Sequence, residues 1–208
     1  ADSLLNEPEA ALKAEGKPYT VSTPYFKKNS QTPVKAVHKT LTSGLTGRKI
    51  KNEKPELLKE FSNRYKLDSA IQGGRYEGLK ILSSLSGFKD YKDKRDFPAI
   101  QGTTHLSAHN KFGTCSIREV YHAMKSKLGA GHALIRQLYW RDFFTHIAFY
   151  FPQVFGRAFQ EKYDKVEWHD NSKLFKAWCE GMTGFPIVDA GMRELNSSGY
   201  MHNRVRMI

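Results

Sequence analysis

A long apolar helical pattern over residues 131–151 constrains the fold of this chain more than any other feature. Leu134, Leu138 and Ile147 are among its apolar positions, and Pro152 follows directly, where a helix commonly ends. It is the most hydrophobic element that the sequence predicts. The sequence shows no internal repeat, no low-complexity tract and no alternating series of strands that would build a sheet. We therefore expect a mainly α-helical fold.

Shorter helical patterns lie on both sides of the long one. Ser116-Ile117-Arg118-Glu119 matches a capping box, in which serine and glutamate satisfy each other's backbone donors, and predicts a helix over residues 116–128. Leucines recur at helical spacing over residues 79–85, between glycines that bound a second helix. The remaining predicted helices cover residues 56–65, 173–180, 187–195 and the last eight residues, 201–208.

The first fifty residues differ from the rest in composition. Four prolines from Pro8 to Pro33, with scattered Gly, Ser, Thr and Lys, break helices and favour extended connections. Residues 1–53 are therefore expected to be mostly an irregular connector. One short strand is predicted at residues 19–23, where aromatic and β-branched residues gather, as the end of a preceding domain. Residues 54–208 would form a separate helical part.

The positive charge of the chain indicates which classes of binding partner it favours. Its 208 residues are 39% hydrophobic, enough for a substantial core, and carry a formal net charge of +12. The positive field favours polyanions, with nucleic acid as the first candidate and an anionic membrane surface as the second. The sequence has no membrane-spanning apolar run and no signal peptide, so we expect an intracellular protein, in the nucleus or cytoplasm, that is not secreted. Cys115 and Cys179 lack metal-ligand spacing and are expected to be reduced thiols.

One face of the long predicted helix carries polar and aromatic groups together. Gln137, Trp140, Arg141 and Phe144 follow i, i+3, i+4, i+7 spacing. In one interpretation the aromatic residues are core and Arg141 forms a structural ion pair with Asp142 or another carboxylate. In the other, Trp140 is a stacking platform and Arg141 clamps an anion or a ligand. The pattern by itself favours the first interpretation and does not exclude the second.

Other candidate residues lie in loops or near the end of the chain. Residues 102–107 form a hydroxyl-rich loop that could donate to phosphate, although a turn with locally bonded Thr and Ser side chains explains the pattern better. Residues 91–95 are a basic stretch that is typical of a solvated surface. Trp168, in a polar setting, is expected to be partly exposed. His202 is expected to pack or hydrogen-bond, because no Cys or Asp stands at metal-ligand spacing, and no metal is predicted.

Several motifs occur in an order that one family shares. They are Tyr91, Arg95-Asp96-Phe97-Pro98, Gly102-Thr103-Thr104-His105-Leu106-Ser107, Tyr139-Trp140-Arg141-Asp142-Phe143, Thr183-Gly184-Phe185-Pro186-Ile187-Val188-Asp189-Ala190 and Met201-His202-Asn203-Arg204-Val205-Arg206-Met207-Ile208. Together they resemble the DNA photolyase/cryptochrome family, from about residue 19 to the last residue. The final motif is most similar to that of cyclobutane pyrimidine dimer photolyases of the bacterial and fungal class.

The resemblance implies a fold and a reaction. Members of the family have an N-terminal α/β antenna domain, a connecting segment and an all-helical domain that holds FAD in a bent conformation. Residues 1–53 would be the connector and the end of the antenna domain, and residues 54–208 an incomplete FAD-binding domain. In repair enzymes, light excites reduced FAD, which donates an electron to a pyrimidine dimer flipped out of the DNA. The antenna chromophore cannot be inferred, because its domain is nearly absent.

The resemblance also assigns residues to the cofactor. The donors of the hydroxyl-rich loop would serve the pyrophosphate, and Asn203 would lie by the reactive nitrogen of the flavin ring. Leu134 stands where some relatives have a tryptophan that contacts the flavin, so its contact would be apolar. The implied FAD contacts are Tyr91, Thr103, Thr104, His105, Leu106, Ser107, Leu134, Arg141 and Asn203.

The same resemblance assigns residues to the DNA. Trp140 would stack on the flipped dimer, Gln137 would hydrogen-bond to its base edge, and Met207 would touch it. These residues and Asn203 form the implied catalytic set. Trp168 matches the outer, solvent-facing member of the family's electron-transfer chain of tryptophans, and the inner members would lie beyond the last residue. The implied DNA contacts are Arg95, Gln137, Trp140, Phe144, Asn203 and Arg204, with Arg95 and Arg204 at phosphates that flank the lesion.

Three functions stay open at this point. The first is light-driven, FAD-dependent repair of pyrimidine dimers by a protein of which this chain is a part. The second is a cryptochrome-like photoreceptor, because Gln137 stands where many dimer-repairing relatives have a glutamate. The third is a cofactor-free DNA-binding remnant, or half of a split protein whose missing C-terminal helices come from a separate chain. We expect apolar faces of the long helix to be exposed, so that the isolated chain is unstable or associates.

Overall fold

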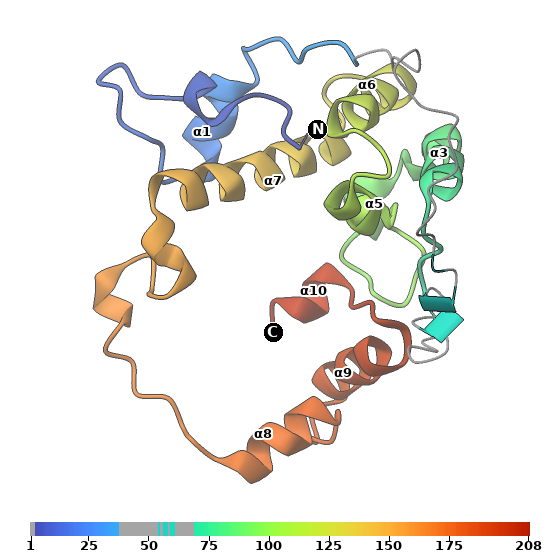
Figure 1. Ribbon diagram of the computed structural model, residues 1–208, viewed down its shortest axis with the longest axis vertical. Coiled ribbons are helices and arrows are strands. Elements are labelled where there is room, and N and C mark those ends of the chain that lie inside the picture. Colours follow the sequence, from blue (N-terminus) through green and yellow to red (C-terminus); the bar gives the residue numbers. More distant parts are fainter. Residues whose placement is uncertain (1–2, 38–53, 55, 58, 61–68) are drawn as a thin grey trace. The chain divides into compact units, whose positions relative to one another are not determined.

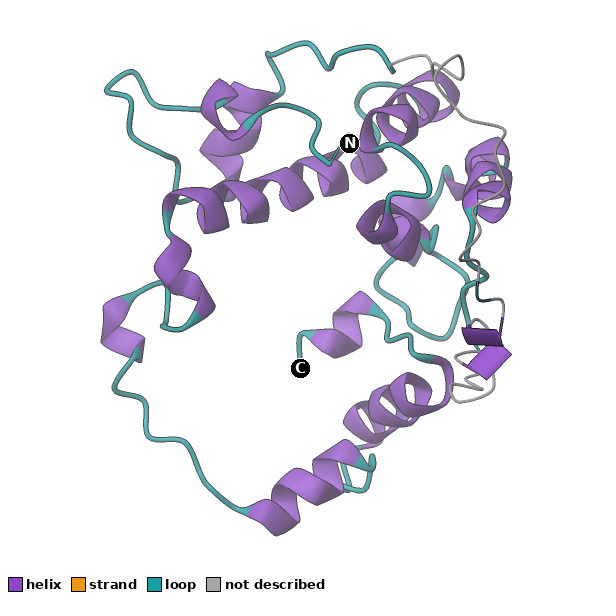
Figure 2. Ribbon diagram, in the orientation of Figure 1, coloured by secondary structure: helices purple, strands orange, loops and turns teal. Residues whose placement is uncertain are grey.

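The computed structural model describes residues 3–37, 54, 56–57, 59–60 and 69–208 (Figure 1). Across these ranges the backbone is helical or irregular, and strand-type pairing is limited to a single antiparallel bridge between Leu12 and Pro18 (Figure 2). The prediction of a mainly α-helical fold is confirmed. The chain divides into two compact units, unit 1 with Ala1–Val37 and Gly73–Asp170, and unit 2 with His38–Gln72 and Asn171–Ile208.

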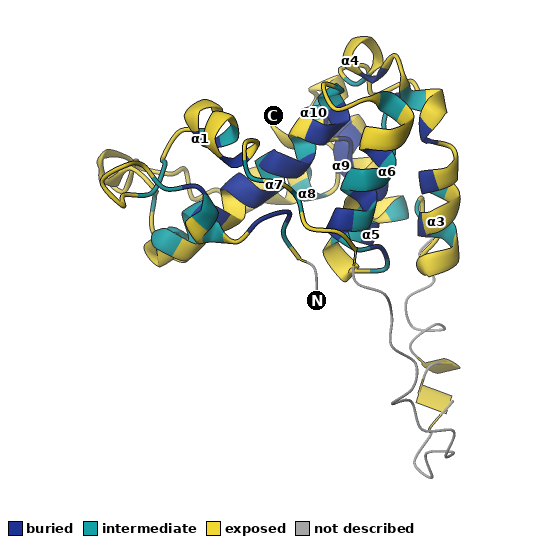
Figure 3. Cartoon of the chain, turned by 90° about the horizontal axis from the view of Figure 1, so that it is seen from above, coloured by how far each residue is buried: buried dark blue, intermediate teal, exposed yellow. Residues whose placement is uncertain are grey.

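Unit 1 is organised around α7 (Ala133–Tyr150), the long helix that the apolar pattern predicts. The ring of His132 caps its start by accepting the backbone N–H of Leu134 at 3.3 Å. Buried residues recur along α7, as the dark segments of Figure 3 show. The elements packed against it include α1 (Ser22–Asn29), α4 (Tyr91–Lys94) and α6 (Ile117–Leu128). A helix that is covered on several sides needs the high apolar content that the sequence shows.

Helix α6 begins where the capping box predicts, but only part of that box forms. The Ser116 side chain makes no capping hydrogen bond, although Glu119 accepts the backbone N–H of Ser116. Both carboxylate oxygens of Glu119 are occupied by the guanidinium of Arg75, with two N–O distances of 2.9 Å. This two-point ion pair joins α6 to the start of α3 (Arg75–Ser83).

The leucine pattern over residues 79–85 forms α3 and then a separate short 3-10 helix, η2 (Leu85–Phe88). Leu82 and Leu85 are buried in the main core, together with residues of α6 and α7. The predicted helix is therefore correct in place, although it is divided at Ser84.

Helix α5 (Leu106–Phe112) packs against α3 at a glycine. A Cβ atom on Gly78 would lie 3.1 Å from the Nδ1 atom of His109 in α5 and 2.6 Å from the Sγ atom of Cys115, which follows α5. The close approach of these segments therefore favours glycine at this position. Cys115 is buried, and both it and Cys179 are free thiols. The expectation of reduced cysteines is confirmed.

The expectation that the prolines of the N-terminal segment break helices is wrong for α1. The prediction of a connector over residues 1–53 stays a prediction. Leu5 and Ala11 are fully buried, and α1 places Tyr25 in the core of unit 1. Polar contacts over a long sequence distance, described below with the site, hold this segment in place. Its prolines do not prevent packing, because η1 (Pro8–Ala10) begins with a proline and Pro24 lies in the first turn of α1, where the backbone N–H is not needed.

The strand predicted at residues 19–23 is also wrong. Residues 19–20 have no regular secondary structure, and α1 already begins at Ser22. The aromatic residue that suggested a strand, Tyr19, instead packs against a cluster formed by Ala11, Tyr25 and Phe143. Burial against helices overrides the local β-propensity here.

Unit 2 contains α8 (Ser172–Cys179), α9 (Pro186–Ser198) and α10 (Asn203–Arg206). The predicted helices at 173–180 and 187–195 are confirmed, and Pro186 occupies the first turn of α9, as expected. The last eight residues form only the single turn of α10. Of the helix predicted at 56–65, the described residues 56–57 and 59–60 are helical, and the rest lies outside the described residues.

Helices α9 and α10 pack through a small apolar core. Met192, Met201 and Val205 are buried there. Gly199 ends α9 with a left-handed backbone (φ 71°), which reverses the chain toward α10. Gly191 lies so close to Val205 that an added Cβ atom would stand 2.2 Å from the valine Cγ1 atom. The contact between the two helices therefore depends on glycine at position 191.

Candidate active site

The face of α7 that the sequence singled out carries a partly exposed aromatic stack. The rings of Trp140 and Phe144 are stacked, with centroids 5.7 Å apart and planes 27° apart. Phe144 is 63% exposed, while Trp140 is half-buried and meets Phe143 edge-on at 5.8 Å. Trp140 is thus anchored against the core, as the first interpretation expects, and also belongs to a stack that reaches solvent. The second interpretation, a stacking platform for a ligand, stays a prediction.

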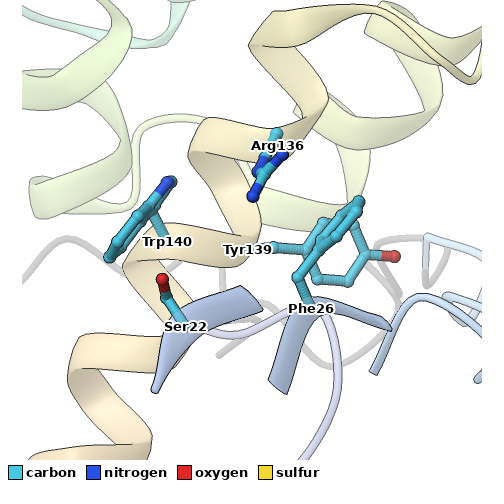
Figure 4. Close-up of a pocket in the computed structure, with 5 residues that line it drawn as sticks. All are labelled: Ser22, Phe26, Arg136, Tyr139 and Trp140. Atoms are coloured by element: carbon cyan, nitrogen blue, oxygen red, sulfur yellow. The ribbon is translucent and has the colours of Figure 1, made fainter. Parts of the chain in front are cut away.

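A small pocket lies beside Trp140 (Figure 4). Its lining residues come from α1 and α7 and are Ser22, Phe26, Arg136, Tyr139 and Trp140. The Arg136 guanidinium lies over the Phe26 ring, 5.1 Å from its centroid. Gln137 directs its amide back to its own helix, where Nε2 donates to the carbonyl oxygen of Ala133 at 3.4 Å. The N-terminal segment therefore forms one wall of the surroundings of Trp140.

Arg141 and Asp142 both contact the first residues of the chain. The Arg141 guanidinium donates to the carbonyl oxygen of Ser3, which is not the structural ion pair with Asp142 that the sequence suggested. Asp142 is 1% exposed, and its Oδ2 atom accepts the backbone N–H groups of Leu5 at 3.0 Å and Asn6 at 3.4 Å. Burial raises the pKa of Asp142 to about 7, against the lowering effect of these backbone donors and of nearby cations.

The hydroxyl-rich loop at 102–107 leads into α5 through a strained residue. His105 has a left-handed backbone (φ 55°), and the Thr104 hydroxyl accepts the backbone N–H of Leu106 at 3.4 Å. The local turn that the sequence favoured is thus present. Thr103 is half-buried and Ser107 is exposed, so both hydroxyl groups lie at or near the surface.

Three of the expected cofactor contacts have buried side chains. Tyr91, Leu106 and Leu134 all belong to the main core of unit 1. Tyr91 also carries the Arg95 guanidinium over its ring at 5.7 Å, and the Nε atom of Arg95 lies 3.6 Å from the Asp96 carboxylate. The side chains of Tyr91, Leu106 and Leu134 therefore contribute to the core of unit 1.

In unit 2, α10 gathers the functional residues predicted near the end of the chain. Asn203 Nδ2 lies 3.5 Å from the Met207 Sδ atom, and a guanidinium nitrogen of Arg204 lies 3.9 Å from the same sulfur. The ring of His202 caps the turn by accepting the backbone N–H of Arg204 at 3.2 Å. His202 is therefore a hydrogen-bonding histidine, as predicted, and it sets the local geometry of all three neighbours.

Trp168 lies on an open hollow of unit 1. It is 86% exposed, as the sequence predicts for a loop tryptophan. The hollow has a volume of about 670 Å³, and its lining includes Phe155, Tyr163 and Val166. The Asp164 carboxylate accepts from Arg157 and from the backbone N–H of Ala158, which orders the loop below the aromatic residues.

Comparison with known proteins relates this geometry to a family. Residues 134–208, which include all of α7 but its first residue and all of α8, α9 and α10, match the family model described as the FAD binding domain of DNA photolyase. Over 218 residues the chain is 36% identical to a protein of Alkalihalophilus pseudofirmus named deoxyribodipyrimidine photo-lyase, covering 100% of this chain and 45% of that protein. An Escherichia coli protein of the same name is 43% identical over 130 residues, which cover 59% of this chain and 28% of that protein. The chain belongs to the DNA photolyase/cryptochrome family.

Solved structures of photolyases and cryptochromes share its fold. A class III photolyase from Agrobacterium tumefaciens is 33% identical with a TM-score of 0.76, over 99% of this chain and 45% of that one. A Synechocystis cryptochrome is 28% identical with a TM-score of 0.77, over 99% of this chain and 46% of that one. The photolyase-family chain thus spans about half the length of the relatives that it matches.

Sequence reasoning missed the polar residues that support the photolyase-family motifs. Asp142 was noted only as a partner for Arg141, and Asp189 was not noted separately from its motif. The Asp189 carboxylate accepts the Thr183 hydroxyl at 2.6 Å and the backbone N–H groups of Thr183 and Gly184 at 2.7 Å and 3.0 Å. The hydrogen bond from the Thr183 hydroxyl is the main cause that lowers the pKa of Asp189. A signal was available, because a carboxylate stands inside each of the two motifs, among aromatic and apolar residues.

The predicted site residues of this family member lie in two units. Unit 1 holds those from Tyr91 to Trp168, and unit 2 holds Asn203, Arg204 and Met207. Among the described residues, no group of three or more His, Cys, Asp or Glu side chains is arranged as a metal site. The described part of the chain likewise has no helix with the length and apolar character needed to cross a bilayer.

Proposed function

We propose that this chain is the part of a light-driven, FAD-dependent DNA repair enzyme, a deoxyribodipyrimidine photolyase, that recognises the pyrimidine dimer. The observation that carries the proposal is the Trp140–Phe144 stack, which reaches solvent from a helix inside the segment matching the photolyase family. Aromatic faces of this kind bind unstacked bases, and a dimer is easier to unstack than an intact base pair.

In this proposal each residue of the α7 face has a separate task. Trp140 stacks on the flipped dimer, and Phe144 extends the apolar platform at its exposed edge. Gln137 turns its amide from the Ala133 carbonyl toward the base edge when the dimer arrives. Because Gln cannot give or share a proton as a carboxylic acid does, it contributes a hydrogen bond and no acid-base chemistry.

The residues proposed to hold FAD fit that role in part. The hydroxyl groups of Thr103, Thr104 and Ser107 stand at or near the surface of one turn, where they suit a pyrophosphate. The Oδ1 atom of the neighbouring Asn110 is buried and has no hydrogen-bond partner among the described residues, which suits an arriving polar group. Reduced FAD, when bound, would supply the electron that breaks the cyclobutane bonds. Asn203 and Met207 are proposed to complete the cofactor and dimer contacts.

DNA is the proposed macromolecular partner. The chain carries a formal net charge of +12, and Arg204 on α10 and Arg95 beside α4 are proposed to contact phosphates that flank the lesion. Such a role places the protein with cellular DNA, in the nucleus or cytoplasm. Trp168, at 86% exposure, is proposed as the solvent-facing end of an electron-transfer route to the flavin.

Binding to damaged and undamaged DNA tests the proposal. The purified chain is titrated with fluorescent duplexes that do or do not contain one thymine dimer, with and without FAD. We expect preferential binding of the damaged duplex and its loss in Trp140→Ala, by about 1–3 kcal/mol for a lost stacking contact. Equal affinity for the two duplexes would argue for a protein that binds DNA by charge alone.

A cryptochrome-like photoreceptor is the second candidate. It is favoured by Gln137 and by the likeness to the Synechocystis cryptochrome. Illumination of the FAD-loaded protein with dimer-containing DNA separates the two functions. Repair restores the absorbance of the intact bases, whereas a photoreceptor changes its flavin spectrum and leaves the dimers unchanged.

A further inference from the structure

Residues 3–11 are here called the strap. Side chains of α6 and α7 form hydrogen bonds with the backbone of the strap. Asp142 accepts the N–H groups of Leu5 and Asn6, and the Arg118 Nε atom donates to the carbonyl oxygen of Leu5 at 3.2 Å. A guanidinium nitrogen of Arg118 also lies 3.6 Å from the Glu7 carboxylate. Two further side chains of α7 form hydrogen bonds with the strap. Arg141 donates to the Ser3 carbonyl, and His146 Nδ1 lies 3.2 Å from the Pro8 carbonyl oxygen.

The contacts that Asp142 and Arg118 make with Leu5 and Asn6 are buried. Leu5 is fully buried, and Asp142 and Arg118 are buried as well. A carboxylate and a guanidinium that leave water lose solvation energy, which only well-formed hydrogen bonds offset. Two such groups directed at the same strap residue therefore indicate a specific attachment.

The strap continues directly into the surroundings of Trp140. Ala11, at the end of the strap, forms a buried cluster with Tyr25 and Phe143, and Trp140 packs against this cluster. The ring of Phe143 meets Trp140 edge-on. Any shift of the strap therefore changes the support under Trp140.

A second connection runs through buried amides. Asn6 Nδ2 donates to the Asn29 Oδ1 atom at 2.9 Å, and Asn29 Nδ2 donates to the Tyr25 hydroxyl at 2.8 Å. The Tyr25 ring lies 5.3 Å from that of Phe143. The strap, α1 and α7 are thus linked by a continuous set of contacts that begins at Asp142 and ends at the aromatic stack.

We propose that Asp142 is a positioning residue, which holds the strap against α7 and thereby fixes the orientation of Trp140 for stacking on a flipped base. Its attachment to Leu5 and Asn6 acts on Trp140 through Ala11 and Phe143. The part that concerns the base rests on the proposed function, whereas the coupling of Asp142 to Trp140 is a property of the fold alone.

Tryptophan fluorescence tests the coupling without any ligand. Trp168→Phe and Trp178→Phe leave Trp140 as the reporter, because the chain contains three tryptophans. In this background we expect Asp142→Leu to raise the acrylamide quenching constant of Trp140. Asp142→Asn, which keeps an acceptor for the strap, should restore the wild-type value. The matched control is Asp164→Leu, which removes a carboxylate that also accepts a backbone N–H but lies outside the strap.

A second variant keeps the test informative if Asp142→Leu fails to fold. Arg118→Met releases the Leu5 carbonyl from the side of α6 and keeps the apolar stem of the arginine. Circular dichroism establishes that each variant retains its helices. An unchanged quenching constant in folded Asp142→Leu and Arg118→Met would overturn the proposal, as would failure of Asp142→Asn to restore it.

Dimer binding provides the functional readout. We expect Asp142→Leu to weaken selective binding of the dimer-containing duplex by about tenfold to a hundredfold, as a small misplacement of a contact group does. Asp142→Asn should bind as the wild type does, and the affinity for undamaged DNA should not change in either variant. Increased quenching with unchanged dimer selectivity would overturn the functional part of the proposal. Absence of selectivity in the wild type itself would instead refute the proposed function and leave the fluorescence result as the test of the coupling.

Discussion

At the scale of single residues, the buried carboxyl of Asp142 links the stability of the fold to pH. Desolvation raises its pKa from 3.8 to about 7, although the backbone N–H groups of Asn6 and Leu5 and the charges of Arg141 and Arg118 favour the ionised form. Its Oδ1 atom has no hydrogen-bond partner among the described residues, in agreement with a group that tolerates a proton. Asp142 is therefore a neutral or nearly neutral acceptor below neutral pH.

The stability of the protein should depend on pH through this group. The folded state binds the proton more tightly than the unfolded state, so the free energy of unfolding should fall as pH rises from about 4 to about 7. Each unit of pKa difference corresponds to about 1.4 kcal/mol. Urea unfolding at a series of pH values measures the effect. Asp142→Asn should flatten this part of the profile, and a profile as steep as that of the wild type would contradict the assignment.

At the scale of secondary-structure elements, α10 owes its shape to its neighbours and not to its length. A single helical turn has little stability alone, because nucleation fixes several residues for one hydrogen bond. It is held by the core that it shares with α9, by the close approach at Gly191 and by the His202 cap. The positions of Asn203, Arg204 and Met207 therefore depend on the packing of α10 against α9 and on the His202 cap.

Replacement of Gly191 by alanine should separate α9 from α10. The new Cβ atom would stand 2.2 Å from the Val205 Cγ1 atom, so one helix must move. We expect a loss of about 1–3 kcal/mol in the free energy of unfolding, as for other overpacked sites. Chemical denaturation measures it, with Gly87→Ala as the control, since a Cβ at Gly87 meets open space. Equal stability of the two variants would show that the contact is not tight.

Two different replacements of His202 test whether its ring stabilises α10 by capping. His202→Leu removes the acceptor for the Arg204 N–H and should cost about 1 kcal/mol of stability, whereas His202→Asn retains a good capping group and should cost less. Thermal unfolding measures the difference, and His169→Leu at an exposed loop position serves as the control. Similar losses for Leu and Asn would mean that packing, and not capping, is the contribution of His202.

At the scale of the whole molecule, strong positive charge is combined with exposed aromatic surface. The formal net charge is +12, while α8 exposes Leu174 and Phe175 by 66% and 65%. Charge of one sign favours binding to polyanions and opposes association, whereas apolar patches favour association. The salt concentration should therefore change the balance between binding to polyanions and self-association of the chain.

Binding to undamaged DNA should weaken as salt rises. The logarithm of the affinity should fall linearly with the logarithm of the salt concentration, with a slope of about −0.9 for each phosphate contact. Arg204→Gln should make the slope less steep by about one unit if Arg204 contacts a phosphate. Fluorescence anisotropy titrations at several salt concentrations measure the slope. Arg157→Gln, at a guanidinium already paired with Asp164, is the matched control.

Association of the chain should increase at high salt, where charge repulsion is screened. The double replacement Leu174→Ser and Phe175→Ser should reduce it, because it removes two exposed apolar side chains from α8. Sedimentation velocity at low and high salt measures the effect. Lys173→Ser, at an exposed position of the same helix, is the control for a change of charge without loss of apolar surface.

The sequence predicted those parts of the fold that depend on neighbouring residues. The helix over 131–151 was visible because its apolar residues recur at helical spacing, and the ends of α9 were visible because Pro186 and Gly199 have fixed backbone preferences. The aromatic and polar face of α7 was visible for the same reason. The family resemblance added the order of the motifs, which local patterns alone do not explain.

Only the tertiary structure decided what the first residues do. Asp142 meets the N–H of Leu5 across 137 positions of sequence, and no local pattern of proline-rich residues predicts such a contact. The same reason applies to the contact between Arg141 and the Ser3 carbonyl, which lie 138 positions apart. The implied contact of Arg141 with FAD stays a prediction. Propensity and periodicity act over a few residues, whereas burial and pairing of polar groups depend on which segments meet in space. The sequence alone thus determined the helices and the family, and the tertiary structure determined which segments meet and which buried polar groups hold them together.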